Sequence, residues 1–588
     1  MLLSDGTEEY LMTAGILIAF ITMVASLFLE RKSVLHIFSS FGVKKKDALI
    51  AVGIALLFIA LEIAIVQPTQ QLFFDDVIYQ GGAQDLLHLG QAWMCNYGTP
   101  TQCFSGEIYH EPIGTAFLLA IGFLFFGIAR YVAYYEFIAL AAISVFMAFA
   151  VGVLLFKSKL AGFFSELLMA LSPAVLVWAA PTTSDLPTML FSLVAVFSLL
   201  VFLYKKSFAS FSFMLFSFAF VAYMKVDAFL LLIMLPFLYM LLYPSGIIAS
   251  IKYAFSRLKK NFLDPKFLSI ILLFLLALLP ELIYVVQQQS VSGNYGDQGV
   301  QIWTTCNLPG TAPQPVKVSG NINMQNFNAN ICGNLEFWGN AYANVYIMQP
   351  LSFTIFAFIG AAFLAIMKRK KALLAILIWF FGFFLLYSAF YAGSVLYGVD
   401  WRFQLSMIPQ ASLLGGFGAA EIVEIFKSKI KKGNTLLFAT IAIIAIAVLF
   451  FSSTLQLYGQ LSIPASSIPQ AMGARFYENF VYANSIYIPS NCLVFTFDPT
   501  LFNINGRAAD QFSNLSEIST PAGYANFSNT WQCMAIDYGY WCESTTASEK
   551  NYCDYEMAQF NTSLITQATI SNSKLNATYS IYKINGLR

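Results

Sequence analysis

The chain is poor in charged residues. Only 11% of its 588 residues are Asp, Glu, Lys or Arg, 58% are hydrophobic, and the formal net charge is +1. So small a net charge gives no indication of nucleic acid or of any acidic partner, and no nucleic acid is expected. Apolar runs of about 20 residues recur instead, which is the length that crosses a hydrocarbon core. The composition therefore indicates a polytopic membrane protein surrounded by membrane lipids.

Histidine is scarcer still, with three residues, and none lies near the four C-terminal cysteines. This disfavours a zinc site there that combines cysteine with histidine. An even number of cysteines, none in an apolar run or a basic loop, indicates disulfides in an oxidising compartment. The eight are Cys95, Cys103, Cys306, Cys332, Cys492, Cys533, Cys542 and Cys553.

The basic residues lie in short loops and predict the topology. Arg31 and Lys32 follow the apolar run 11–29, and Lys44 to Lys46 precede the run 48–66, so the loop between them is expected to be cytoplasmic. Twelve spans fit every basic loop and place both termini outside. They are 11–29, 48–66, 131–156, 160–180, 186–204, 207–224, 226–243, 267–286, 351–367, 372–391, 403–425 and 435–453.

Two apolar segments need separate treatment. The Gly-containing run 113–127 is about 15 residues long, and counting it as a span would invert every later loop, so it is interpreted as an interfacial or re-entrant helix. The run 11–29 follows acidic residues and precedes no small-residue cleavage site, so it is expected to be a retained span.

The predicted spans divide the chain into three parts. An extra span and a basic loop occupy 1–47, a transmembrane domain occupies 48–453 with outer loops 67–130 and 287–350, and an extracytoplasmic domain occupies 454–588. Alternating apolar residues in the last part predict strands at 485–488 and 493–498. The expected fold class is an all-α polytopic membrane protein of about twelve spans with a small mixed α/β C-terminal domain.

Ionisable residues gather near the outer ends of the spans, where a charge is costly unless it has a role. Asp75 and Asp76 are adjacent in a segment that could form a short helix on the membrane. Adjacent side chains on a helix point about 100° apart, so the two carboxylates are expected to have separate roles. The other members of this set are His110, Glu111, Asp185, Lys225, Asp227, Asp400 and Arg402.

The order of these motifs resembles the GT-C glycosyltransferases, in particular the protein O-mannosyltransferase and lipid A aminoarabinose transferase branch. The acidic pair is followed by Tyr109-His110-Glu111-Pro112-Ile-Gly and by Leu-Phe-Phe-Gly127, which look like the family's His-x-Pro-Leu-Gly and Leu-Phe-Gly pattern. The similarity continues through Ser184-Asp185 and Met224-Lys225-Val-Asp227 to Asp400-Trp-Arg402. It covers about 48–425, whereas the extra span and the cysteine-bearing C-terminal domain depart from it.

The resemblance implies an inverting transferase that moves a sugar, a hexose such as mannose, from dolichyl or polyprenyl phosphate to a protein or a lipid or glycan acceptor. Asp75 and Asp76 are then the candidate catalytic residues, with Asp75 favoured as the base, and Arg402 and Lys225 bind the donor phosphate. His110, Glu111 and Asp185 position the acceptor or hold a divalent metal ion. The spacing alone does not decide which aspartate takes the proton.

Other interpretations stay open at this point. His110 could cap a loop, Lys225 could extend from a span end to water, and Arg402 could form a structural ion pair with Asp400 or Asp227. A transporter would also suit twelve spans with buried charges, although the repeats typical of transporters are not evident. A non-catalytic protein of the same fold is the third alternative.

Overall fold

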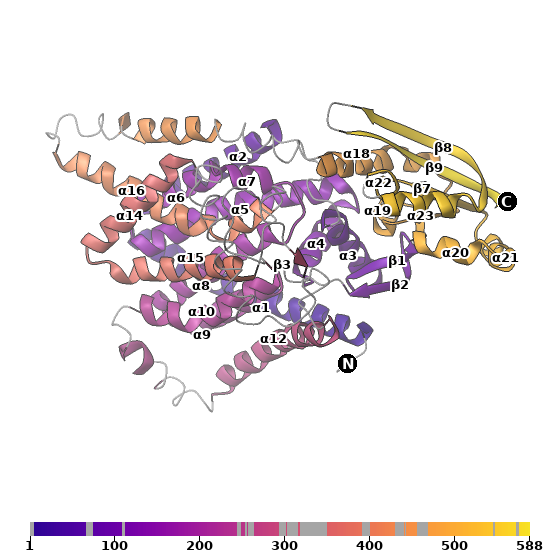
Figure 1. Ribbon diagram of the computed structural model, residues 1–588. Coiled ribbons are helices and arrows are strands. Elements are labelled where there is room, and N and C mark those ends of the chain that lie inside the picture. Colours follow the sequence, from indigo (N-terminus) through magenta and orange to yellow (C-terminus); the bar gives the residue numbers. More distant parts are fainter. Residues whose placement is uncertain are drawn as a thin grey trace.

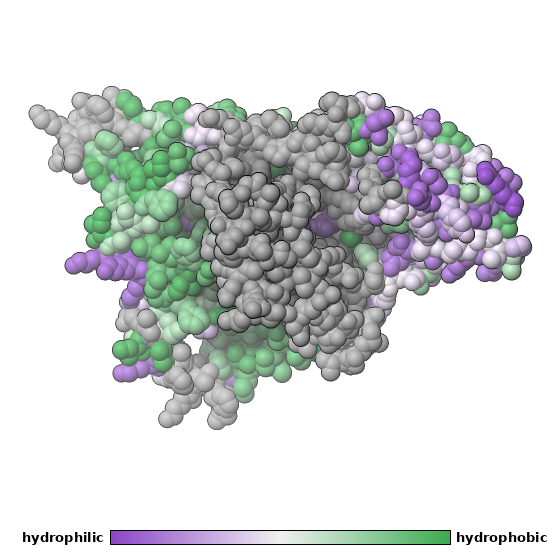
Figure 2. Space-filling model, in the orientation of Figure 1, coloured by the Kyte–Doolittle hydropathy of each residue, from purple (hydrophilic) through white to green (hydrophobic). Residues whose placement is uncertain are grey.

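The computed structural model describes residues 5–65, 75–108, 112–243, 248–252, 256, 264–292, 301–302, 316–317, 350–390, 400–429, 440–441, 443–455, 469–544, 547–571 and 575–588. Within them, a bundle of helices is joined at one end to a smaller α/β domain (Figure 1). The bundle residues that carry a colour in Figure 2 are mostly hydrophobic, whereas those of the α/β domain are more hydrophilic. This contrast fits a membrane-embedded part and a part in water.

Six of the described helices are long and apolar enough to cross a membrane. They fall within α1 (Asp5–Ser40), α2 (Lys45–Ile65), α5 (Arg130–Phe156), α8 (Asp185–Lys205), α12 (Pro265–Ser292) and α15 (Lys370–Phe390). Shorter apolar helices include α4 (Gly114–Phe126), α9 (Phe208–Ala222), α10 (Phe229–Leu242), α14 (Leu351–Ile366) and the segment Ile443–Leu455. The integral membrane class is therefore supported, and the total of twelve spans stays a prediction.

Three predicted spans are not single α-helices. The segment 226–243 begins as the 3-10 helix η1 (Val226–Ala228) and continues as α10. The segment 160–180 divides into α6 (Lys159–Ala170) and α7 (Pro173–Trp178), because a proline disfavours the helical conformation of the residue before it, and Ser172 is extended. The segment 403–425 starts inside a 3-10 helix, η4 (Asp400–Ser406), and continues as α16 (Ile408–Lys429). α16 packs against α6 and α14, which holds η4 at the end of the bundle.

The α/β domain is built on a seven-stranded sheet with the order β2-β1-β6-β5-β7-β9-β8. The neighbours β6-β5-β7 are parallel and the other pairs are antiparallel. β1 and β2 come from the loop 67–130, so this loop joins the C-terminal sheet. The strands are β1 (Trp93–Thr99), β2 (Gln102–Ile108), β5 (Cys492–Thr496), β6 (Ala508–Gln511), β7 (Cys533–Tyr538), β8 (Phe560–Ser571) and β9 (Asn576–Leu587).

The central strand explains why the sheet has helices on both faces. All five residues of β5 are buried; Cys492 and Val494 belong to one apolar cluster, and Leu493 and Phe495 to another. Alternate side chains of a strand point to opposite faces, so a continuously apolar strand needs cover on both. The helices of this domain are α18 (Pro469–Asn484), α19 (Pro499–Ile504), α20 (Leu515–Ile518), α21 (Pro521–Thr530), α22 (Tyr540–Ser544) and α23 (Ala547–Met557).

The strand predicted at 493–498 is confirmed in position, whereas the one at 485–488 is wrong. Ser485–Tyr487 forms a 3-10 helix, η5. The side chains of Ile486 and Tyr487 are 70% and 62% exposed, so the alternation there does not mark a buried face.

Disulfides are confirmed at Cys95–Cys103, Cys492–Cys533 and Cys542–Cys553. The first closes the β1–β2 hairpin, and the second joins the adjacent parallel strands β5 and β7. Cys306 and Cys332 lie outside the described residues.

Candidate functional site

A short helix carries the two adjacent aspartates, as predicted. α3 (Asp75–Leu89) begins at Asp75, and both carboxylates lie in its first turn, where the positive end of the helix dipole favours negative charge. Asp76 is fully buried, whereas the Asp75 side chain is 18% exposed. Asp75 pairs with Arg402 and Asp76 accepts a hydrogen bond from Thr182, and their separate roles stay a prediction.

Arg402 of η4 connects Asp75 to Asp185. Its Nη1 atom lies 2.5 Å from Oδ2 of Asp75, and its Nε atom lies 3.4 Å from Oδ2 of Asp185 at the start of α8. The Arg402 side chain is 13% exposed and that of Asp185 is fully buried. Three segments distant in sequence thus meet at one guanidinium. Among the described residues, Arg402 forms ion pairs with Asp75 and Asp185.

Lys225 continues this network on the other side of Asp185. Its Nζ atom lies 2.9 Å from Oδ1 of Asp185 and 3.2 Å from Oδ2 of Asp227, which belongs to the 3-10 helix η1 (Val226–Ala228). The ammonium also lies 4.1 Å from the ring centre of Phe403. The Lys225 side chain is only 2% exposed, so the interpretation that it extends to water is wrong.

A glycine in the family-like motif places this lysine. The Gly114 N–H donates to the carbonyl oxygen of Tyr223 at 2.8 Å, and a Cβ at position 114 would overlap that oxygen. The start of α4 can therefore lie directly against the turn that precedes Lys225. The segment 113–127 forms α4, which packs against α3 and α5.

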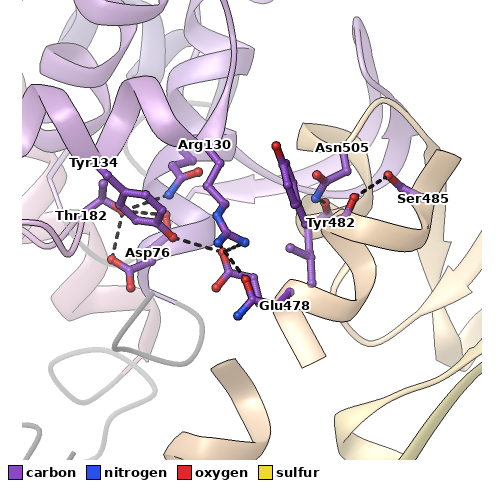
Figure 3. Close-up of polar contacts among 11 residues, drawn as sticks. Asp76, Arg130, Tyr134, Thr182, Glu478, Tyr482, Ser485 and Asn505 are labelled. Carbon is purple, nitrogen blue, oxygen red and sulfur yellow. Dashed lines mark hydrogen bonds and ion pairs between the residues drawn. The ribbon is translucent and has the colours of Figure 1, made fainter. Parts of the chain in front are cut away.

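Asp76 lies in a second set of contacts (Figure 3). Its Oδ1 atom accepts a hydrogen bond of 3.0 Å from the Thr182 hydroxyl, in the segment between α7 and α8. Thr182 in turn accepts a hydrogen bond of 3.2 Å from Gln80 on α3. Asp76 is thereby fixed against the segment that leads to Asp185.

Beside Asp76, α18 of the α/β domain meets α5 of the bundle through a contact that the sequence analysis missed. In Figure 3, Glu478 faces Arg130 and Tyr134. Arg130 Nη1 lies 3.3 Å from Oε1 of Glu478, which also accepts a hydrogen bond of 3.2 Å from the Tyr134 hydroxyl. Burial, partly offset by the Arg130 charge, raises the pKa of Glu478 to about 8. A basic residue at the start of a span was the available signal, but nothing in the sequence indicated its partner.

Some of the predicted site residues and metal ligands lie outside the part of the chain that the structure describes. His110 and Glu111 lie outside the described residues, as does the side chain of Asp400. Among the described residues, Asp85, Cys95 and Cys103 form a group of potential metal ligands. Both sulfurs are bonded to each other, so this group offers no thiolate to a metal. A divalent metal held by His110, Glu111 or Asp185 therefore stays a prediction.

The fold is similar to solved structures. ArnT from Cupriavidus metallidurans bound to undecaprenyl phosphate has a TM-score of 0.50 and 11% identity, over 92% of this chain and 98% of that chain. ArnT in the apo state has a TM-score of 0.51 and 10% identity, over 91% and 97%. An oligosaccharyltransferase from Archaeoglobus fulgidus, tethered with an acceptor peptide, has a TM-score of 0.47 and 10% identity, over 91% and 74%.

No protein-family model and no curated protein sequence matches the chain. The similarity to ArnT nevertheless extends over nearly the full length of both chains. At this level of identity it establishes the fold, and the resemblance inferred from the motifs points to the same fold. The chain therefore has the fold of the GT-C glycosyltransferases.

Proposed function

We propose that the chain is an integral membrane glycosyltransferase that moves a sugar from a polyprenyl-phosphate donor to a protein or a lipid or glycan acceptor. The single observation that carries this proposal is the position of Arg402 between Asp75 and Asp185 at the end of the bundle. Support comes from the fold, which is shared with a protein whose crystal structure contains undecaprenyl phosphate. The reaction is assigned to the extracytoplasmic side, because the basic loops and the cysteines predict that these residues lie there.

The donor's physical chemistry suits this position. A polyprenyl tail stays in the hydrocarbon core, so its phosphate and the anomeric carbon can reach only the membrane surface. A guanidinium binds phosphate through two parallel hydrogen bonds, and Arg402 is the cation that reaches the partly exposed edge of the network. Lys225 is more enclosed, so its contribution to donor binding is exerted through Asp185 and the Phe403 ring.

The charge of the network suggests how binding and chemistry are coupled. Among the described residues, Asp75, Asp185 and Asp227 supply three carboxylates, and Lys225 and Arg402 supply two cations. An incoming phosphate adds further negative charge. When Arg402 turns to the phosphate, the Asp75 carboxylate gives up this ion pair and can accept a hydrogen bond from the acceptor hydroxyl.

Asp75 then takes the proton of the acceptor hydroxyl as the new bond from oxygen to the anomeric carbon forms. The bond from that carbon to the phosphate oxygen breaks at the same time, and polyprenyl phosphate leaves with the electron pair. A single displacement of this kind inverts the anomeric centre. Asp76, Asp185, His110 and Glu111 are assigned to positioning the acceptor or holding a divalent metal.

The test uses the purified full chain in nanodiscs with radiolabelled polyprenyl-phosphate hexoses, mannose among them, and membranes from a strain lacking the protein as the source of acceptor. Loss of a general base costs roughly 10²- to 10⁴-fold in rate, so Asp75→Asn should reduce transfer by about that factor. Glu424→Gln, at an exposed carboxylate near the C-terminal end of α16, is the matched control. The proposal fails if folded Asp75→Asn and Asp76→Asn variants both transfer label at the parent's rate.

A further inference from the structure

A cavity of about 70 Å³ lies between α3 and the α/β domain, away from the side chains of the ion-pair network. One water molecule needs roughly 10–15 Å³ of such a cavity, so this one has room for several waters or for part of a ligand. Val77 and Ile78 of α3 line one wall, and Glu478 of α18 and Asp498 after β5 line another.

The fold itself favours a ligand at this place. β5 lies between β6 and β7 and is parallel to both. The next strand in sequence, β6, pairs with one edge of β5, and the following strand, β7, pairs with its other edge. In open α/β sheets, ligands bind outside the carboxyl ends of the strands where the strand order reverses in this way. Asp498 follows the carboxyl end of β5, and Gln511 ends β6; both line the cavity.

Two buried carboxylates at this edge have an oxygen without a described partner. Glu478 is 3% exposed, and its Oε1 atom contacts Arg130 and Tyr134 while its Oε2 atom has none. Asp537 of β7 does not line the cavity itself but is hydrogen-bonded to the lining residue Tyr477; it is 2% exposed, its Oδ2 atom accepts hydrogen bonds from the Tyr477 and Thr496 hydroxyls, and its Oδ1 atom has no partner among the described residues. A buried acceptor left without a donor is unfavourable, so a ligand rich in donors would be stabilised at the Glu478 oxygen.

The lining selects the class of ligand. Glu478 and Asp498 are the acidic residues of this lining, which contains no Lys or Arg, so the cavity offers a phosphate no cation and is not a second site for the lipid carrier. Burial raises the pKa of Asp498 and of Glu478 to about 8, so near neutral pH both carboxyls can donate as well as accept hydrogen bonds. Arg130 Nη1 already lies 3.3 Å from Oε1 of Glu478, which disfavours a second cation beside that carboxyl. The remaining lining is largely apolar and includes the Phe497 ring.

We propose that this cavity binds the hydroxyl groups of a saccharide, which makes a glycan, or a molecule that already carries one, the acceptor. Sugar hydroxyls are donors and acceptors together, and the C–H face of a pyranose suits an apolar and aromatic wall. This assignment rests on the proposed glycosyl transfer and specifies the acceptor class.

The position relative to α3 connects the cavity to the candidate base. Val77 and Ile78 directly follow Asp75 and Asp76, so a saccharide in the cavity touches the first turn that carries both carboxylates. Gly81 fixes this arrangement, because a Cβ there would overlap the methyl group of Thr500 on α19, another lining residue. The α/β domain is thus held at close range against α3.

The experiment measures saturation-transfer NMR from the full chain in nanodiscs to methyl hexosides, with ethylammonium as the competing cationic probe. The parent should transfer saturation to at least one methyl hexoside. Asp498→Leu, which removes the hydrogen-bonding group, and Ala474→Leu, which fills the cavity, should reduce that signal at least tenfold. Asp498→Asn keeps a donor and an acceptor and should retain most of it.

The proposal is overturned if the parent gives no signal with any hexoside, or if folded Asp498→Leu and Ala474→Leu retain it. It is also overturned if ethylammonium alone binds and is lost in Asp498→Leu, because the site would then select a cation. Arg402→Ala separates this site from the transferase proposal: it should lose undecaprenyl phosphate binding and keep the hexoside signal. A hexoside signal in a parent that transfers no label would contradict the transferase proposal and leave the saccharide site standing.

Discussion

Arg402 and Asp75 form an ion pair across 327 residues of sequence, with 2.5 Å between Nη1 and Oδ2. The pair joins the 3-10 helix η4 to the first turn of α3, and through Asp185 it reaches α8 as well. A carboxylate and a guanidinium at a partly exposed edge can exchange partners when an anion arrives. In the proposed reaction, the pair would therefore link donor binding to the availability of the Asp75 carboxylate.

Replacing Arg402 tests this link directly. Arg402→Ala removes the charge and the two parallel donors, and should weaken undecaprenyl phosphate binding by about 10- to 100-fold, the equivalent of a charge-assisted hydrogen bond of roughly 1.5–3 kcal/mol. Arg402→Lys keeps the charge but loses the fork, so its affinity should lie between those of the parent and Arg402→Ala. Titration of the lipid into nanodisc-bound protein measures both, with exposed Lys427→Ala as control. Equal affinity in all variants would remove Arg402 from the donor site.

Lys225 gives a different expectation, because its ammonium is buried between two carboxylates. Lys225→Met leaves Asp185 and Asp227 facing each other without their shared cation, and breaking a buried pair in this way costs roughly 3–5 kcal/mol. Thermal unfolding should therefore occur at a clearly lower temperature. Adding Asp227→Asn to Lys225→Met removes one of the opposed charges and should restore part of the loss. A Lys225→Met protein with the parent's melting temperature and weaker lipid binding would instead make Lys225 a direct phosphate ligand.

The sequence was sufficient to predict which residues lie near the site, but not which of them form ion pairs. Hydropathy and basic loops place Asp75, Asp185, Lys225 and Arg402 near one end of the bundle, and the structure joins all four. Which cation meets which carboxylate depends on how η4 packs against α3 and α8, and no local pattern encodes a contact between residues 327 positions apart. The sequence allowed the side chain of Lys225 to extend into water, because the rings that lie beside its ammonium, Tyr387 and Phe403, come from distant segments.

The limits of prediction for the fold have similar causes. Hydropathy locates apolar segments but does not distinguish an α-helix from the 3-10 turn that carries Arg402. The hairpin of β1 and β2 was hidden in a loop, because its sheet partner β6 lies about 400 residues further along the chain. Arg130 and Glu478 were overlooked for the same reason, since each alone is an ordinary charge near the end of a segment.

The disulfide between Cys492 and Cys533 should contribute more stability than the one between Cys95 and Cys103. The two bridges close loops with sequence separations of 41 and 8 residues, and the loop-entropy relation gives about 4 and about 2.5 kcal/mol. The paired substitutions Cys492→Ala/Cys533→Ala and Cys95→Ala/Cys103→Ala, compared by thermal unfolding of the purified chain, test this order. Equal or reversed losses would show that packing around β5 and β7, rather than loop closure, determines the effect.

The α/β domain should lose stability as pH rises, because of the two carboxyls at the ends of β5 and β7. Burial raises the pKa of Asp537 from 3.8 to about 7, and burial together with the neighbouring Asp537 raises that of Asp498 to about 8. Groups facing Asp537 include the Tyr477 hydroxyl on α18 and the Thr496 hydroxyl on β5.

Because the folded domain holds these protons more tightly than the unfolded chain, their stabilising effect is complete below about pH 4. It is lost as pH rises to about 7–8 and changes little above that. The loss is at most about 1.4 kcal/mol per pH unit for each group. Thermal unfolding followed from pH 5 to pH 9 should therefore show a falling midpoint, and Asp537→Asn with Asp498→Asn should flatten the curve. Asp554→Asn, at an exposed carboxylate of the same domain, should leave the slope unchanged. A midpoint that rises over this range in the parent, with the same slope in the double variant, would mean that both aspartates are ionised in the folded protein.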